Sequence, residues 1–411
     1  MITFDDVLAA RERLGDAIYY SPCPHSVALS QITDCDVYCK MDYLQRTGSF
    51  KERGARNALL LLDSSQQQRG VVAASAGNHA LGLAYHGQQL GIPVTVVMPR
   101  FAPLIKITNC EKMNAKVLLH GETFADAQDE AHRLEEQQQL AYVHGFDDPA
   151  VIAGQGTMGL EILEQVPDVE AIVLPVGGGG LIAGVALAVK SQYPDVLIIG
   201  VEPQSFASYN AALQAGHPES IEAQHTLADG LAVPKIGDNA FALAKRYVDS
   251  VVTVSEDALA LAILRISELE KGVVEGAGAA PLAALLEGRL PELKGKMTVL
   301  ALAGGNIDPA TFCRVIEKGL VADGRLHRFT ASISDRPGGL AEFTKIVAEV
   351  GASIKDITHD RAFSGPDAFA VNILTVVETR DEGHIYQLHE TLHAHGIPFQ
   401  AHTGNEILRS M

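Results

Sequence analysis

The residues around one lysine, Lys51, indicate that its side chain takes part in a chemical reaction. Lys51 lies in the segment 49–55 (Ser-Phe-Lys-Glu-Arg-Gly-Ala), directly after a Thr-Gly pair. An alternating, strand-like run precedes it at 36–41, and a run with an apolar helical stripe follows at 55–62. We therefore expect Lys51 at the entrance of a helix, where the helix dipole disfavours a positive charge. Such a lysine can carry a carbonyl compound as a Schiff base and, once released, act as a nucleophile or base. The alternative is an ordinary solvated lysine.

Three glycine-bearing turns follow runs that are predicted to be buried strands. The first, 75–79 (Ser-Ala-Gly-Asn-His), leads into a helix, where free backbone N–H groups bind anions such as a carboxylate. Its alternative is a plain tight turn. The second has four consecutive glycines at 177–180, which can form a nest for a phosphate. A dinucleotide competes for this turn, but the four-glycine run blurs the required spacing, so we favour a single phosphate. The third turn is 303–306 (Ala-Gly-Gly-Asn).

Charge and composition exclude several classes of protein. The net charge of -18 argues against a nucleic-acid or anionic-membrane surface, which needs a basic footprint. The 411 residues predict two or three domains. The five cysteines are scattered and odd in number, which fits a reducing cytoplasm. We see no signal peptide at the N-terminus and no apolar run near the roughly 18 residues that a membrane span needs.

Strands and helices alternate through residues 1–318. This alternation predicts parallel sheets that are buried on both faces. We expect two α/β units that share a cleft, with the smaller subdomain at about 45–145. The predicted strands are 36–41, 71–75, 92–99, 115–119, 141–143, 171–175, 196–201, 251–254 and 298–302.

The pattern of predicted strands and helices changes after Lys318, at the linker-like segment 319–324. Beyond it we expect a strand, a helix, two strands joined by a hairpin turn at 364–367, a second helix and a last strand. This βαββαβ order predicts a ferredoxin-like unit at 325–402. Its elements are predicted at 326–333, 340–350, 353–363, 368–378, 381–393 and 397–401.

A lysine that can form an imine, a phosphate nest and a carboxylate-sized turn together indicate pyridoxal phosphate chemistry. On these motifs, residues 1–318 resemble the threonine/serine dehydratase family of fold-type II pyridoxal-phosphate enzymes, whose fold is like that of the tryptophan synthase β subunit. The match covers this whole region in family order, and it includes Ala228-Asp229-Gly230. Residues 327–402 resemble an ACT domain, a small-molecule regulatory module, through the signature 335–340 (Asp-Arg-Pro-Gly-Gly-Leu).

The resemblance implies a role for each matching position. Lys51 would carry the cofactor imine and move the α-proton, Phe50 would lie against the pyridine ring, and Asn78 would hydrogen-bond the ring hydroxyl. The phosphate would be held by Gly177, Gly178, Gly179, Gly180 and Leu181. The substrate carboxylate would be held by Ser75, Ala76, Gly77, Asn78 and His79.

The sequence departs from the family's pattern at several positions. Ala303 stands where the family has a serine or cysteine that faces the pyridine nitrogen, which implies slower chemistry or rescue by a neighbour. Ala76 stands where serine racemases place a serine that protonates the opposite face. Glu202 matches a cation ligand of some relatives, but Ser208 replaces its partner acid, so we predict no metal.

One further motif points to a metal but lacks the necessary context. Residues 389–393 spell His-Glu-Thr-Leu-His, a zinc motif when it lies on a helix beside a cleft. Here it falls in the second helix of the predicted regulatory unit, and we interpret it as a solvated helix face.

The resemblance implies β-elimination of L-threonine to 2-oxobutanoate and ammonia, and of L-serine to pyruvate, in isoleucine biosynthesis or in threonine breakdown. The alternatives are action on another hydroxyamino acid such as 3-hydroxyaspartate, serine racemisation, and an amino-acid-sensing protein with little catalysis. The resemblance also implies a cytoplasmic homodimer or homotetramer. Isoleucine or valine would bind near Gly338, Gly339, Ser353 and Ile354.

Overall fold

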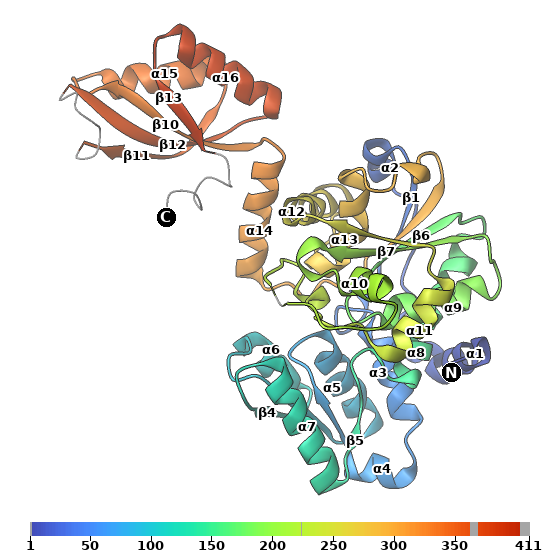
Figure 1. Cartoon of the computed structure of the whole chain (residues 1–411). Helices are drawn as coiled ribbons and strands as arrows, with labels where there is room; N and C mark the ends of the chain where they lie inside the picture. Colours follow the sequence, from blue (N-terminus) through green and yellow to red (C-terminus); the bar gives the residue numbers. More distant parts are fainter. Residues whose placement is uncertain (1, 223, 362–368, 403–411) are drawn as a thin grey trace. The chain divides into compact units, whose positions relative to one another are not determined.

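The computed structural model describes residues 2–222, 224–361 and 369–402 (Figure 1). The chain divides into two compact units, Met1–Phe312 and Cys313–Met411. Helix α14 (Pro309–Ala322) continues through most of the segment 319–324, where the sequence analysis expects a linker. That expectation was wrong because Gly319 is buried within the helix, and a single glycine weakens a helix by only about 1 kcal/mol without ending it.

The larger sheet of the first unit is parallel throughout, with the strand order β1-β9-β6-β7-β8. Its central strand β6 (Ala171–Pro175) is buried at every residue, which confirms the prediction of a sheet covered on both faces. The other strands are β1 (Asp36–Lys40), β7 (Leu197–Pro203), β8 (Ser250–Val254) and β9 (Met297–Ala301).

The helices that accompany this sheet supply most of its core. Helix α9 (Gly180–Lys190) is buried at all but its last residue and packs against α8 (Pro149–Gln165). The others are α1 (Phe4–Leu14), α2 (Val27–Thr33), α10 (Ser208–Ala215), α11 (Asp238–Tyr247), α12 (Glu256–Arg265) and α13 (Gly276–Leu286). Short 3-10 turns include η2 (Asp42–Leu44) and η4 (Asp229–Leu231), and a π-helical turn spans Ile266–Glu270.

The smaller sheet is also parallel, with the order β4-β3-β2-β5, and its strands fall inside the range 45–145. They are β2 (Val71–Ala74), β3 (Val94–Met98), β4 (Lys116–Leu119) and β5 (Ala141–Tyr142). The accompanying helices are α3 (Lys51–Leu60), α4 (Ser64–Arg69), α5 (Asn78–Leu90), α6 (Leu104–Lys112) and α7 (Phe124–Gln138).

Helix α3 is held between α5 and α8 at very short range. A Cβ atom at Gly82 of α5 would lie 3.3 Å from the carbonyl oxygen of Lys51, and one at Gly154 of α8 would lie 2.7 Å from that of Arg53. These glycines let the backbones approach closely. The first turn of α3, which carries Lys51, is therefore fixed from two sides.

The second unit has the predicted βαββαβ order. Its elements are β10 (Leu326–Ser334), α15 (Gly339–Val350), β11 (Ser353–Asp360), β12 (Ala370–Glu378), α16 (Glu382–Ala394) and β13 (Phe399–His402). The strands form an antiparallel sheet in the order β11-β12-β10-β13. The hairpin turn predicted at 364–367 lies outside the described residues.

The last strand starts two residues later than the predicted 397–401, because Ile397 is used elsewhere. Its N–H donates to the carbonyl of Leu392 and so closes the end of α16. Pro398, which follows, has no N–H to give to a strand. Among the described residues, no helix is long and apolar enough to cross a membrane.

Candidate active site

Lys51 is the first residue of α3, as the sequence predicts. Its Nζ atom donates to the carbonyl oxygen of Gly145 at 2.6 Å and lies 5.2 Å from the centre of the Phe50 ring. Burial lowers the pKa of Lys51 to about 8, and the carboxylate of Glu275 opposes this shift. The amine is thus poised to lose its proton near neutral pH, which an imine-forming lysine requires.

The segment before Lys51 is joined to the third glycine turn. Phe50 N–H donates to the carbonyl of Ala303 at 3.0 Å, and Gly305 N–H donates to the carbonyl of Gly48 at 2.9 Å. The Asn306 side chain donates through Nδ2 to the carbonyl of Thr47 at 2.6 Å. The structure therefore brings together two of the segments that the sequence analysis singled out.

The first glycine turn meets the same place through Asn78. Its Oδ1 accepts from Asn306 Nδ2 at 2.8 Å, and its Nδ2 donates to Glu275 Oε1 at 2.7 Å. Ser75 Oγ accepts from the N–H groups of Gly77 and Ala80 at 3.2 and 3.3 Å. Within the described residues, the N–H groups of Ala76, Asn78 and His79 meet no acceptor, so the start of α5 keeps donors for an anion.

The His79 ring makes its hydrogen bond outside this set of donors. Its Nε2 lies 3.0 Å from the carbonyl of Val143, and the ring is buried. Burial lowers the pKa of His79 to about 3, so the imidazole is neutral. Its backbone N–H belongs to the free donors at the start of α5 and suits the predicted contact with a carboxylate.

The four-glycine turn is a cradle that side chains would fill. A Cβ atom at Gly178 would lie closer than 3.0 Å to the Phe146 ring, and one at Gly180 equally close to the Phe146 carbonyl oxygen. Gly179 has φ +87°, which favours glycine. In the described part of the chain, the N–H groups of residues 177–181 meet no acceptor, and they lie at the N-terminus of α9. This arrangement fits a phosphate.

Lys51 and the four-glycine turn adjoin two consecutive residues. Gly145 accepts from the Lys51 amine, and Phe146 packs directly on Gly178 and Gly180. Positions far apart in the chain thus place an amine and a phosphate nest around one dipeptide. Pyridoxal phosphate carries an aldehyde and a phosphate on one small ring, so the residues present fit this cofactor.

We predict that Gly178→Ala weakens cofactor binding by roughly ten-fold or more, because overpacking costs about 1–3 kcal/mol. Equilibrium dialysis with pyridoxal phosphate measures the change. Gly159→Ala in α8 is the control, since the nearest atoms to its Cβ lie at 3.2 Å. Equal losses in the two variants would contradict a specific role for Gly178.

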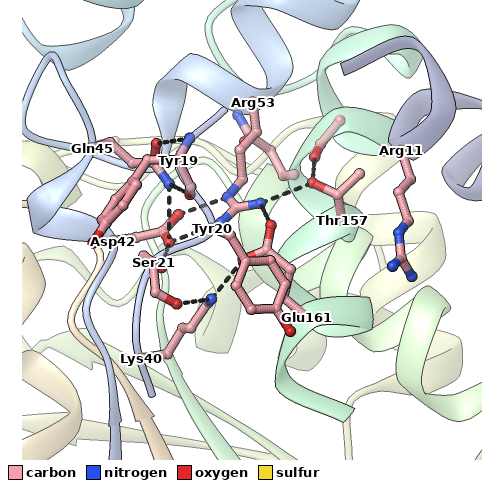
Figure 2. Close-up of polar contacts among 12 residues, drawn as sticks. Arg11, Tyr19, Tyr20, Ser21, Lys40, Asp42, Gln45, Arg53, Thr157 and Glu161 are labelled. Atoms are coloured by element: carbon pink, nitrogen blue, oxygen red, sulfur yellow. Dashed lines mark hydrogen bonds and ion pairs between the residues drawn. The ribbon is translucent and has the colours of Figure 1, made fainter. Parts of the chain in front are cut away.

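A network of buried charged side chains lies below α3 (Figure 2). The sequence analysis does not predict this network. Arg53 donates from Nε and Nη2 to Asp42 at 2.7 and 2.9 Å, and from Nη1 and Nη2 to Glu161 at 2.5 and 2.8 Å. Its remaining N–H reaches Thr157 Oγ1 at 3.2 Å. Lys40 Nζ donates to Glu161 at 2.6 Å. All five guanidinium hydrogens are therefore used.

This network holds Asp42 and Arg53 charged in spite of burial. Burial alone would raise the pKa of Asp42, but Arg53, with Lys40 and Ser21, outweighs it and keeps that pKa below its ordinary value. The same two carboxylates raise the pKa of Arg53 against its own burial. The network links η2, α3 and α8, and so fixes the helix that carries Lys51.

Glu202 already has partners other than a cation. Its carboxylate accepts from the N–H groups of Tyr209 and Asn210 at 2.7 and 3.1 Å, and from Asn210 Nδ2 at 2.9 Å. Burial raises the pKa of Glu202 to about 7. The Glu202 carboxylate is therefore used to bind N–H groups at the start of α10. The described residues contain no group of three or more side chains that suits a metal.

The motif at 389–393 lies on α16, as predicted. His389 Nε2 lies 2.9 Å from His327 Nε2 of β10, so the two rings share a hydrogen bond. His393 is exposed.

The four residues predicted to bind an effector do not meet within one chain. Gly338 and Gly339 follow Ser334, whose partner on β12 is Ala370. Ser353 and Ile354 pair with Glu378 and Val377, at the other end of β12. Gly339 lines a cavity of about 430 Å³ together with Ser334, Phe343 and His395. The length of β12 separates the two pairs within one chain, and the effector site stays a prediction.

Comparisons with known proteins agree with this geometry. The family model described as "Pyridoxal-phosphate dependent enzyme" matches residues 14–305. An L-threonine ammonia-lyase of Thermotoga maritima is 47% identical over 397 residues, which cover 96% of this chain and 98% of that protein. The chain therefore belongs to the family of pyridoxal-phosphate dependent enzymes.

Two solved structures also resemble this chain over about three quarters of its length. Threonine deaminase isoform 2 of Solanum lycopersicum, in its processed form, matches with a TM-score of 0.73 and 38% identity, over 77% of this chain and 86% of that one. A serine racemase from Dictyostelium discoideum matches with a TM-score of 0.71 and 33% identity, over 75% of this chain and 99% of that one. The fold class is thus confirmed.

Proposed function

We propose that this protein removes ammonia from L-threonine by pyridoxal-phosphate dependent β-elimination, which yields 2-oxobutanoate, and that it converts L-serine to pyruvate in the same way. The observation that carries the proposal is the meeting of Lys51 and the four-glycine turn around Gly145 and Phe146. The relative from Thermotoga maritima, named for this activity, supports the choice of threonine.

The chain's own residues divide the work. Bound pyridoxal phosphate supplies an electron sink for the carbon that loses its proton. The Lys51 amine, with its lowered pKa, holds and moves that proton. The N–H groups at the start of α5 bind the substrate carboxylate, and those at the start of α9 bind the phosphate. Phe50 and Asn78 would hold the ring.

A keto-acid assay over a panel of hydroxyamino acids tests the proposal. We expect 2-oxobutanoate from L-threonine and less pyruvate from L-serine. If oxaloacetate from 3-hydroxyaspartate were the dominant product, 3-hydroxyaspartate would be the substrate instead of L-threonine. Formation of D-serine in the same samples would favour the racemase alternative, which the resemblance to the Dictyostelium enzyme keeps open. Ala76, which has no proton to give, argues against racemisation.

Ala303 gives a prediction of its own. Its side chain is buried and has no polar atom, whereas a serine at this position would give the pyridine nitrogen a partner. We expect Ala303→Ser to raise the turnover number by about five-fold, the equivalent of about 1 kcal/mol for one hydrogen bond. Steady-state rates measure the change. Ala301→Ser, an equally buried position on β9, is the control. An unchanged rate for Ala303→Ser would remove the argument.

The second unit is proposed to be an ACT domain that binds isoleucine or valine. Its βαββαβ order and its Gly338-Gly339 turn at the start of α15 support this assignment. Because the two predicted pairs lie at opposite ends of β12, a single site needs a second copy of the chain, which fits a cytoplasmic homodimer or homotetramer. Titration calorimetry with each amino acid tests the proposal, and the absence of heat for all of them would count against regulation.

A further inference from the structure

His144 directly precedes the dipeptide that adjoins both Lys51 and the four-glycine turn. Its Nδ1 atom accepts hydrogen bonds from the N–H groups of Phe146 at 3.3 Å and of Asp147 at 3.0 Å. In the described part of the chain, no backbone carbonyl accepts from either N–H group. Because a backbone N–H can only donate, Nδ1 carries no hydrogen, and the proton of the neutral ring is on Nε2.

The surroundings of the ring preserve this acceptor. Burial lowers the pKa of His144 to about 4, helped by the charge of Lys51, so the imidazole is neutral near pH 7. A protonated ring would carry hydrogen on both nitrogens and could not accept at all. The ring also packs edge-on against the Phe146 ring, with the centroids 4.5 Å apart and the planes at 89°. His144 therefore holds both the backbone and the side chain of the turn that follows it.

The other end of this turn is bonded to the start of α11. Asp147 Oδ1 accepts from the Ala240 N–H at 2.9 Å, and the Asp147 carbonyl accepts from Asn239 Nδ2 at 2.9 Å. Gly237, which directly precedes α11, donates from its N–H to the carbonyl of Gly178 at 3.1 Å. The turn 144–147 is thus also connected to the four-glycine turn through α11.

The residues in the middle of the turn make the contacts that matter for the site. The Gly145 carbonyl accepts from the Lys51 amine at 2.6 Å, and Phe146 packs on Gly178 and Gly180. Neither Gly145 nor Phe146 has a polar side chain that could hold the turn in place. Its shape therefore depends on the backbone hydrogen bonds, and two of these go to His144 Nδ1.

We propose that His144 is a positioning residue, whose Nδ1 atom holds the turn 144–147 in the shape that places the Gly145 carbonyl against the Lys51 amine and Phe146 against the four-glycine turn. The consequence for cofactor binding rests on the proposed function. The hold on the turn does not, because its hydrogen bonds exist in the protein without cofactor.

Two variants with the same amide group separate the position of the acceptor from the presence of a polar side chain. In His144→Asn the oxygen is bonded to Cγ, as Nδ1 is, and asparagine side chains commonly accept from the N–H two residues further on. In His144→Gln the oxygen lies one bond further out. By equilibrium dialysis with pyridoxal phosphate, we expect His144→Asn to bind within about two-fold of the wild type and His144→Gln to bind roughly ten-fold more weakly.

Hydrogen exchange in the cofactor-free protein measures the hold on the turn directly. The amides of Phe146 and Asp147 should exchange roughly ten-fold faster in His144→Gln than in the wild type, because they lose their acceptor and open more readily to solvent. In His144→Asn they should keep the wild-type rate.

His384→Gln is the matched control. His384 is a buried histidine of the second unit, and its Nδ1 also accepts from a backbone N–H, that of Arg380 at 3.1 Å. This variant should bind pyridoxal phosphate as the wild type does. Unchanged binding in His144→Gln, or binding in His144→Asn as weak as in His144→Gln, would overturn the proposal.

The wild-type protein decides if His144→Gln does not fold. Slow exchange of the Phe146 and Asp147 amides would support the proposal, and exchange as fast as in an unfolded peptide would overturn it. The proposed function can fail separately. A wild type that binds pyridoxal phosphate but releases no keto acid would contradict the function alone, and the binding series would still judge His144. A wild type that binds no pyridoxal phosphate would contradict both.

Discussion

Replacement of Lys51 by alanine is expected to lower the turnover of L-threonine by at least roughly 10²- to 10⁴-fold, the range for a positioned acid or base. The visible absorbance of the bound cofactor should disappear as well. Both results follow from the roles proposed for the Lys51 amine, which are to hold the coenzyme covalently and to move the substrate proton. Steady-state rates and the absorption spectrum of the purified variant measure them.

Two variants separate chemistry from charge and from folding. Lys51→Arg keeps a positive charge but cannot form an imine, so we expect it to be as inactive as Lys51→Ala. Lys294→Ala removes an exposed lysine that pairs with Asp34 at 2.7 Å, and it should leave rate and spectrum unchanged. Substantial activity in Lys51→Ala would contradict the assignment of Lys51.

The sequence predicts those parts of the site that local pattern encodes. Lys51 at a helix start, the four-glycine turn after a buried strand and the turn at 75–79 all have short-range signals, and the structure places each as expected. Parallel sheets follow from the alternation of strands and helices. The order of the strands within each sheet cannot be predicted from this alternation. Neither can the contacts between the three glycine turns. Both depend on which segments that are distant in the sequence pair with one another.

Glu275 shows why the other residues of the site could not be predicted from the sequence. It follows a run without distinctive spacing, and its contacts reach Gly304 and Asn78, which are distant in the sequence. Arg53 was missed for a related reason. A helix that opens with Lys-Glu-Arg predicts a solvated face, yet Glu52 and Arg53 are both buried. Arg53 lies against Glu161 of α8, and Glu52 lies against His86 of α5. Only the tertiary packing of α5 and α8 against α3 reveals that the charges have partners.

The second large effect is expected at Arg53. Arg53→Ala should lower the free energy of unfolding of the first unit by roughly 3–5 kcal/mol, because it leaves the Asp42 carboxylate buried without its paired cation and leaves Glu161 with Lys40 alone. Folded proteins have only about 5–15 kcal/mol of stability, so the variant should unfold at clearly lower denaturant. Urea unfolding followed by circular dichroism measures the change.

Arg11→Ala is the control for this result (Figure 2). Arg11 pairs with Glu164 at the surface, where its side chain is 47% exposed, and such pairs contribute about 0–1 kcal/mol. Arg53→Lys should lie between the wild type and Arg53→Ala, because an ammonium keeps the positive charge but has three hydrogens where the network uses five. A loss at Arg53 no larger than at Arg11 would mean that solvent or rearrangement satisfies the carboxylates. The network would then not be what fixes α3 beneath Lys51.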